Sequence, residues 1–236
     1  MPASSFAAET AREILPAMPR IVVVSPHLDD AVLSCGGLLG ARPGSTVVTV
    51  YAGVPDAADL LTDWDRRCGF GSAAEAMRER RREDARAMAI VRGHGLALGF
   101  LDSQYIACAD AGLLALTEAL MRTLAELRPD AVAIPLGLLH ADHVRVSDAA
   151  LMVRDAWRGP AWLVYEDVPY RCLPGMVQAR FAQLHARGVI VAPADFAVDT
   201  RAKSLAVAAY TSQLKGLQRE PAELGRQERY WHLVDG

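Results

Sequence analysis

Residues 21–30 of this chain, IVVVSPHLDD, decide its fold. The four apolar, mostly β-branched residues at 21–24 are typical of a strand buried in a parallel sheet. The proline that soon follows ends the strand, because proline cannot donate a hydrogen bond to a sheet ladder. His27, Asp29 and Asp30 are therefore expected at the carboxyl end of the strand, where open α/β sheets bind their ligands.

This turn offers one imidazole and two carboxylates, all of which donate electron pairs. It therefore favours a metal ion over a phosphate, which glycine-rich turns bind through backbone N–H groups. Catalytic zinc takes three protein ligands and leaves a fourth position for water, so the turn alone is an incomplete site. Taken by themselves, the same residues could merely cap the helix predicted from Asp30 onward. The metal interpretation requires a further donor elsewhere.

The second candidate cluster is HADH, residues 140–143. It follows the apolar run at residues 130–134, which predicts another strand that ends at a proline. Because parallel strands end at the same edge of a sheet, we expect the two clusters to lie together. They contain three of the six histidines of the chain, a concentration that favours a metal site.

Both clusters resemble the signatures of a known family. PHLDD at residues 26–30 resembles the first signature of the PIG-L / LmbE-like family of zinc-dependent N-deacetylases, and HADH at residues 140–143 resembles the second. Their order and spacing also match, and less specific similarities cover most of the chain. The chain departs from the family at Leu28, where proline is usual, and at Ala31, where glutamate is frequent.

The resemblance implies a role for each polar residue of the two clusters. The implied Zn²⁺ ligands are His27, Asp30 and His143, with water at the open position. Asp29 would take the proton of that water. His140 would stabilise the oxyanion or protonate the leaving amine, and Asp142 would orient a histidine.

Two further residues are candidates for substrate binding. Arg80 and Asp84 fall on the apolar stripe of a helix predicted over residues 72–91, so we expect them to be partly buried and held by partners. The resemblance implies that Arg80 helps to hold the substrate, whereas the alternative is a structural ion pair. Asp102 follows the strand predicted at residues 96–101 and would bind substrate hydroxyls or form a turn.

Apolar strand patterns alternate with helical patterns along the chain. Strands are expected at residues 21–24, 45–51, 96–101, 130–134, 162–165 and 188–191, and helices at residues 5–15, from 30 to 36 or 40, and at 72–91, 113–127, 142–157, 177–187 and 200–213. This alternation predicts one three-layer, Rossmann-like α/β domain over residues 1–236, with a mostly parallel sheet and helices on both faces.

The long segment at residues 53–71 has no clear period and starts at the same sheet edge, so we expect a loop that walls the active site. Trp64 within it would either stack on a sugar ring or pack the loop onto the core. The last twenty or so residues are polar and predict no element.

Composition narrows the class of protein. The chain has 236 residues, of which 52% are hydrophobic and 22% charged, and its net charge of −3 gives no reason to expect nucleic acid. The four cysteines are scattered and the N-terminus has no apolar leader, which predicts a reduced, cytoplasmic protein in which Cys68 is structural. No apolar run approaches the ~18 residues that span a membrane.

The resemblance implies a zinc-dependent hydrolase that removes an N-acetyl or other N-acyl group from an amino sugar such as N-acetylglucosamine, or from a similar hydroxylated small molecule. One alternative is a non-catalytic Rossmann-like small-molecule-binding module, but that class predicts a Gly-x-Gly-x-x-Gly turn after the first strand. Another is a metal-dependent hydrolase of a different ester or amide.

Overall fold

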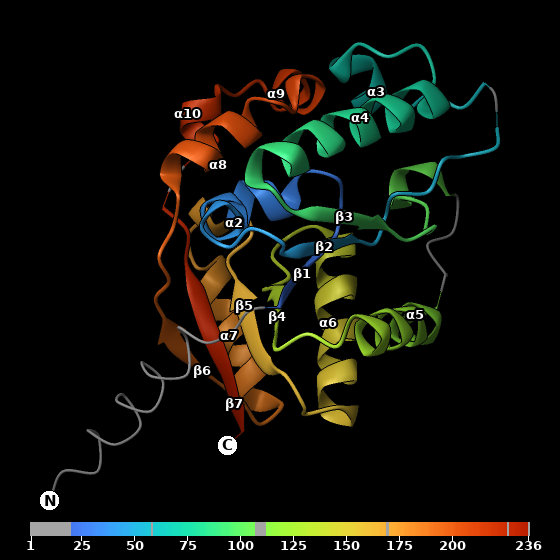
Figure 1. Ribbon diagram of the computed structural model, residues 1–236. Coiled ribbons are helices and arrows are strands. Elements are labelled where there is room, and N and C mark those ends of the chain that lie inside the picture. Colours follow the sequence, from blue (N-terminus) through green and yellow to red (C-terminus); the bar gives the residue numbers. More distant parts are fainter. Residues whose placement is uncertain (1–19, 58, 107–111, 169, 226, 236) are drawn as a thin grey trace, which may run out of the picture.

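The structure is a computed structural model that describes residues 20–57, 59–106, 112–168, 170–225 and 227–235. These residues form one seven-stranded sheet in the order β3-β2-β1-β4-β5-β7-β6 (Figure 1). Its strands are β1 (Ile21–Ser25), β2 (Thr46–Thr49), β3 (His94–Ala97), β4 (Ala131–Pro135), β5 (Ala161–Tyr165), β6 (Val189–Ala194) and β7 (Tyr230–Asp235). Strands β1 to β5 pair in parallel, whereas β7 is antiparallel to both β5 and β6. The predicted mostly parallel α/β sheet is confirmed.

Helices cover both faces of this sheet. They are α2 (Asp30–Ala41), α3 (Asp63–Cys68), α4 (Ala73–Val91), α5 (Leu113–Leu127), α6 (Ala141–Ala156), α7 (Met176–Ala186), α8 (Thr200–Val207), α9 (Thr211–Leu217) and α10 (Pro221–Leu224), with 3₁₀ turns η2 (Ser103–Tyr105) and η3 (Tyr170–Cys172). Figure 1 shows α2, α4 and α8 on one face and α5, α6 and α7 on the other. In the described part of the chain, no helix is both long and apolar enough to cross a membrane.

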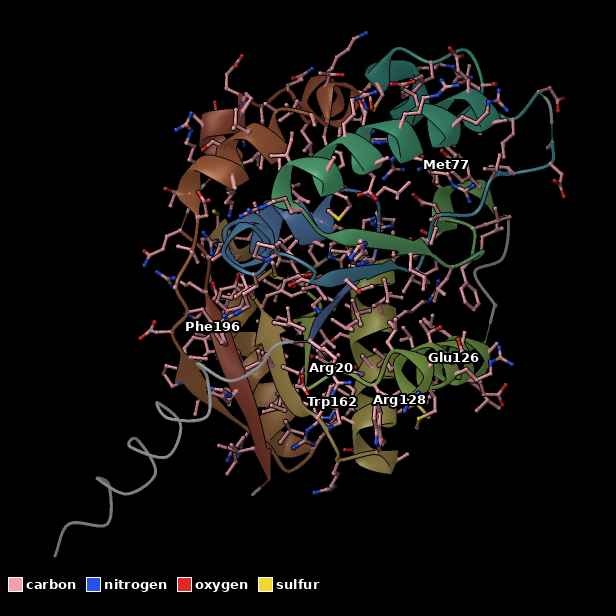
Figure 2. All side chains as sticks on the ribbon, in the orientation of Figure 1. Arg20, Met77, Glu126, Arg128, Trp162 and Phe196 are labelled. Carbon is pink, nitrogen blue, oxygen red and sulfur yellow. The ribbon has the colours of Figure 1, made fainter. Side chains whose placement is uncertain are left out.

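Two apolar cores follow from the alternation of side chains along each strand. Val23 of β1 packs in the core under α2, α4 and α8, whereas Val22 and Val24 pack in the core against α5, α6 and α7. All three are almost fully buried, as expected for a strand covered on both faces. The amino ends of the strands, marked by Arg20 and Trp162 in Figure 2, lie opposite the edge that carries the two clusters. The three-layer architecture is therefore confirmed, while the limits of a single domain at 1–236 stay a prediction.

Helix α2 packs closely against α8. A Cβ atom added at Gly40 would lie 2.6 Å from Cβ of Ala202, so only glycine fits there without a shift. Behind the same helix, Nζ of Lys203 forms a buried ion pair of 2.9 Å with Glu228. The Glu228 carboxylate also accepts hydrogen bonds from the backbone N–H groups of Gly37 (2.7 Å) and Leu38 (3.0 Å). The helix that begins at Asp30 is thus fixed along its length.

The sequence pattern missed or misplaced several elements. Strand β7 was not predicted, because its pairing partners β5 and β6 lie far away in the sequence and its own pattern is short. The single helix expected at residues 200–213 is divided into α8 and α9, with Tyr210 between them; its hydroxyl donates a 2.7 Å hydrogen bond to Asp84 of α4.

Two elements at the carboxyl edge also differ from expectation. The segment at residues 53–71 contains helix α3, which begins with a capping box in which Thr62 and Asp65 exchange hydrogen bonds. Strand β3 pairs with β2 from His94 to Ala97, so it begins two residues before the expected strand at 96–101 and ends four residues before the expected end. The helix expected at residues 5–15 lies outside the described residues.

We expect Gly40→Val to lower the free energy of unfolding by about 1–3 kcal/mol, the usual cost of overpacking. Urea denaturation measures this change. Ala202→Gly in the Gly40→Val background should recover part of the loss, because the two Cβ atoms collide. Gly99→Val is the matched control, since nothing lies within 4 Å of a Cβ at that position. Equal losses in both glycine variants would contradict the close packing of α2 on α8.

Candidate active site

The turn after β1 is shaped by its own side chains. The Ser25 hydroxyl donates a 2.7 Å hydrogen bond to the carbonyl of His27 and accepts one of 3.0 Å from the N–H of Ala31. These bonds close the turn and start helix α2. Asp29 precedes the helix with φ 145°, a conformation that side chains rarely adopt. Such strain persists only where the surroundings impose it, and it is common in active sites.

His27, Asp30 and His143 meet at the carboxyl edge of the sheet. Oδ2 of Asp30 lies 3.1 Å from Nδ1 of His27 and 3.2 Å from Nε2 of His143. In this group, one ligand atom from each residue lies within 4.8 Å of the others. Ligand atoms at about 2.0–2.1 Å from a tetrahedral zinc ion stand about 3.3–3.4 Å apart, so the spacing fits an ion of this kind. All three side chains are buried.

The electrostatics of this group also favour a cation. Burial alone would lower the pKa of His27, but the charge of Asp102 and hydrogen bonds with Asp142 and Asp30 raise it to about 9. Burial would also lower the pKa of His143, but the charge of Asp30 and the hydrogen bond with Asp167 raise it well above its usual value. The two histidines in turn lower the pKa of Asp30 despite its burial. A centre that holds positive charge so strongly fits a divalent metal ion.

Asp167 is a site residue to which the sequence analysis gave no role. Its Oδ1 lies 2.7 Å from Nδ1 of His143, and its Oδ2 accepts hydrogen bonds from the N–H groups of Gly137 (2.9 Å) and Leu138 (3.2 Å). Carboxylates of this kind fix the orientation of a histidine ligand and increase its basicity. The available signal was the position of Asp167 just after β5, at the same sheet edge.

Asp29 lines the same cavity beside Arg80. Burial and the charge of Asp30 raise the pKa of Asp29 to about 7, against the opposing charge of Arg80. Nη2 of Arg80 lies 3.9 Å from Oδ1 of Asp29, and its Nη1 lies 3.6 Å from Oδ2 of Asp102. Arg80 and Asp84 are both buried and have partners, as expected, and the partner of Asp84 is the hydroxyl of Tyr210. Arg80 therefore faces the cavity and is held by acidic partners there.

Asp102 forms a turn and also lines the cavity. It caps turn η2, with Oδ1 3.1 Å from the N–H of Gln104 and Oδ2 2.8 Å from Nε2 of the same residue. The remaining neighbours of Oδ2 are Arg80 and, at 3.7 Å, Nε2 of His27. Burial opposes the charge of Asp102, but His27 and Arg80 lower its pKa overall.

His140 and Asp142 flank the centre on the side of α6. Nδ1 of His140 accepts a 3.3 Å hydrogen bond from the N–H of Asp142, which assigns the proton of a neutral imidazole to Nε2. Burial, His27 and His143 lower the pKa of His140, so this ring is neutral near pH 7. The Asp142 carboxylate lies 3.1 Å from Nε2 of His27 and 4.0 Å from Nδ1 of His140. Asp142 therefore lies closer to His27 than to His140.

The cavity above these residues has a volume of about 340 Å³. The segment at residues 53–71 contributes Trp64 and Arg67 to its wall. The Trp64 indole donates a 3.3 Å hydrogen bond to Oε1 of Gln213, and its ring lies 5.0 Å from the Arg67 guanidinium. Trp64 is thus packed in place and also faces the cavity. Burial raises the pKa of Cys68 to about 11, consistent with a structural thiol.

The carboxyl edge of this mostly parallel sheet holds two histidines and a carboxylate at the spacing of metal ligands. The protein is therefore an α/β protein with a candidate metal centre. Residues 22–153, more than half of the chain, match the family model of PIG-L, described as GlcNAc-PI de-N-acetylase. The chain belongs to this family. The resemblance noted in its sequence is confirmed.

Individual relatives agree with this assignment. The chain is 35% identical over 192 residues to a 2'-N-acetylparomamine deacetylase of Streptomyces fradiae, an alignment that covers 72% of this chain and 64% of that relative. A crystal structure of an A40926 pseudoaglycone deacetylase is 27% identical with a TM-score of 0.72, and covers 92% of this chain and 98% of that one. The zinc-inhibited form of a teicoplanin deacetylase has the same fold, at 23% identity, a TM-score of 0.74 and the same coverage.

We expect Zn²⁺ to stabilise the purified, chelator-treated protein against heat. Binding to the native state at about 100-fold the Kd contributes ~2.7 kcal/mol. For a domain of this size, that corresponds to a rise in Tm of about 5–10 °C. His143→Ala should remove most of the shift, whereas His185→Ala on the exposed side of α7 should retain it. A full shift in His143→Ala, measured by differential scanning calorimetry, would exclude His143 as a ligand.

Proposed function

We propose that this protein is a metal-dependent N-deacetylase that hydrolyses the acetamide of an N-acetylated amino sugar. The observation that carries the proposal is the group His27, Asp30 and His143 beside the carboxylate of Asp29, in a chain of the GlcNAc-PI de-N-acetylase family. The names of the relatives, which denote deacetylases of paromamine and of a pseudoaglycone, support a sugar-containing substrate.

Zn²⁺ is the metal that we propose for the centre. Two imidazoles and one carboxylate form a common ligand set of catalytic zinc and leave a coordination position open. When bound, the ion would supply Lewis acidity that lowers the pKa of water and polarises the amide carbonyl. Asp142 and Asp167 hold the outer ring nitrogens of His27 and His143, which fixes the orientation of both imidazoles.

Asp29 is proposed as the general base. It lines the cavity next to Asp30, and its pKa of about 7 suits a carboxylate that takes a proton near neutral pH. Nη2 of Arg80, 3.9 Å from Oδ1, favours the ionised form of Asp29 that must be present before the reaction. Asp29 has a strained backbone just before helix α2, whereas Asp30, the proposed ligand, is the first residue of that helix.

His140 is proposed to stabilise the oxyanion. Its proton is assigned to Nε2, because Nδ1 accepts the N–H of Asp142, and the side chain is 39% exposed. A neutral imidazole that donates one hydrogen bond can stabilise negative charge on the carbonyl oxygen as the water attacks. The amine that leaves takes the proton that Asp29 has just accepted from the water, while the neutral His140 keeps its single proton.

Arg80 and Asp102 are proposed to bind substrate hydroxyls. Both line the cavity, and Nε of Arg80 is buried without a hydrogen-bond partner among the described residues. A buried polar atom of this kind is costly unless a ligand satisfies it. The proposed partner of the protein is therefore an N-acylated, hydroxylated small molecule, and a cytoplasmic location is part of the same proposal.

The decisive experiment is a substrate panel. Purified protein loaded with one equivalent of Zn²⁺ is incubated with N-acetylated amino sugars, N-acetylated aminoglycoside fragments and simple N-acyl amines, and the released primary amine is quantified. We expect release from the sugars and little from the simple amines. Absence of amine release from every sugar, with zinc bound, would overturn the proposed function.

Variants of the two adjacent acids test the proposed roles. Asp29→Asn should keep zinc but lower kcat by about 10²-fold or more, the scale of a lost general base. Asp30→Asn should weaken zinc binding, because an amide oxygen is a poorer zinc donor than a carboxylate. Zinc content and turnover are measured on both. If Asp29→Asn loses zinc and Asp30→Asn retains it, Asp29 is the ligand and Asp30 the base. Normal turnover in Asp29→Asn would exclude Asp29 as the general base.

The value of kcat/KM tests whether Arg80 and Asp102 contact the substrate. Arg80→Ala and Asp102→Ala should lower kcat/KM and retain zinc, because these side chains are proposed to hold hydroxyls and not the metal. Arg82→Ala, whose side chain is 69% exposed on the same helix, is the control and should leave kcat/KM unchanged. An Arg80→Ala variant that unfolds, as followed by circular dichroism, would instead support a structural ion pair.

A further inference from the structure

The turn that leads to His140 has an unusual backbone conformation. The N–H of His140 donates a 2.7 Å hydrogen bond to the carbonyl of Leu138, so residues 138–140 form a γ-turn. Its central residue, Leu139, has φ 57°, which makes this the rare and strained form of the γ-turn. The side chain of Leu139 is 57% exposed, so its own packing does not impose the strain. Other contacts must therefore hold the turn.

We propose that Arg180 of α7 is a positioning residue that holds this turn and thereby places His140 beside the oxyanion. Nε of Arg180 donates a 2.9 Å hydrogen bond to the carbonyl of Leu136, and Nη2 donates to the Ser147 hydroxyl (3.1 Å) and to Oδ1 of Asp148 (2.8 Å). The Arg180 side chain is only 7% exposed. It thus ties α7 and α6 to the start of the turn, although it is not one of the described residues that line the cavity.

The start of the turn is fixed on several sides. The N–H of Leu136 donates a 2.8 Å hydrogen bond to the carbonyl of Tyr165, and the Leu136 carbonyl also accepts the Ser147 hydroxyl at 3.1 Å. A Cβ atom added at Gly137 would lie 2.7 Å from Cβ of Ser147, so the chain runs directly against α6 there. Because this end cannot shift, the chain takes the strained conformation at Leu139 to reach the beginning of α6.

His140 depends on this backbone because its ring has few restraints of its own. Within the described part of the chain, the 3.3 Å bond from the N–H of Asp142 is the only hydrogen bond of the ring, and the side chain is 39% exposed. His143, in contrast, is 1% exposed and lies 2.7 Å from Oδ1 of Asp167. Release of the turn would therefore move His140 and leave His143 in place. A displacement of about 1 Å can lower a rate ~10²-fold.

The kinetic test replaces the guanidinium of Arg180. Arg180→Met keeps an apolar stem and removes the donors, so kcat should fall about 10-fold or more, with KM and bound zinc unchanged, because an oxyanion contact acts in the transition state. Arg187→Ala is the matched control: Arg187 binds the same Asp148 oxygen (3.0 Å) but is 41% exposed, and its kcat should stay at the wild-type value. Loss of zinc in Arg180→Met would contradict a role confined to His140.

A double-mutant cycle separates positioning from a general structural role. The inference rests on the proposed function, because the role of His140 belongs to it. If Arg180 acts through His140, Arg180→Met should lower kcat in the wild type but not further in the His140→Ala background. Equal falls in both backgrounds would overturn the proposal, and so would a His140→Ala variant with the kcat of the wild type. If Arg180→Met does not fold, Ser147→Ala, which removes the other donor to the Leu136 carbonyl, takes its place in the cycle.

A crystal structure of the zinc-loaded variant gives a readout that does not require activity. In Arg180→Met, or in Ser147→Ala if that variant replaces it, residues 136–140 and the His140 ring should be displaced, whereas His27, Asp30 and His143 should keep their positions. An unchanged turn would overturn the proposal. A wild-type protein that releases no amine would refute the proposed function, and the crystal structure would still decide whether Arg180 holds the turn.

Discussion

The site depends on the parallel pairing of β1 with β4. These strands are neighbours in the sheet, with Ile21 opposite Ala131 and Val23 opposite Ala133, although more than a hundred residues separate them in the chain. Parallel neighbours end at the same edge, so the turn after β1 and the start of α6 lie together. Any slip of this register would move His143 by one residue spacing relative to Asp30 and break the 3.2 Å contact between them.

The carboxyl edge is backed by a chain of buried polar contacts behind the cavity wall. Glu83 of α4 is fully buried and accepts hydrogen bonds from the N–H (2.7 Å) and hydroxyl (2.6 Å) of Ser212 and from the hydroxyl of Thr211 (2.8 Å). These donors belong to the start of α9, whose Gln213 holds Trp64. A buried carboxylate with several donors fixes its neighbours firmly. Helix α4 thereby carries Arg80 and also supports the part of the cavity wall formed by Trp64 and Gln213.

The clusters and the sheet were accessible from sequence because their signals are local. Four β-branched or apolar residues, a proline and then His27 and Asp30 predict a strand, its end and a polar site without knowledge of the rest of the chain. Strand β7 and the pairing of Asp167 with His143 were not accessible in this way. Asp167 is one acid among many until the fold places it against His143, and β7 becomes a strand by pairing with β5 and β6. The break at Tyr210 likewise depends on Asp84, a distant partner.

The position of β7 constrains how this chain acquires its structure during synthesis. Strand β7 lies between β5 and β6, and in the described residues β6 pairs with no other strand. Until Tyr230–Asp235 leaves the ribosome, β5 has an open edge and β6 has no place in the sheet. The parallel strands that carry the site can assemble earlier, so the nascent chain passes through a stage with an exposed, apolar strand edge. Such edges attract other chains, which makes prompt docking of β7 on β5 a condition for avoiding aggregation.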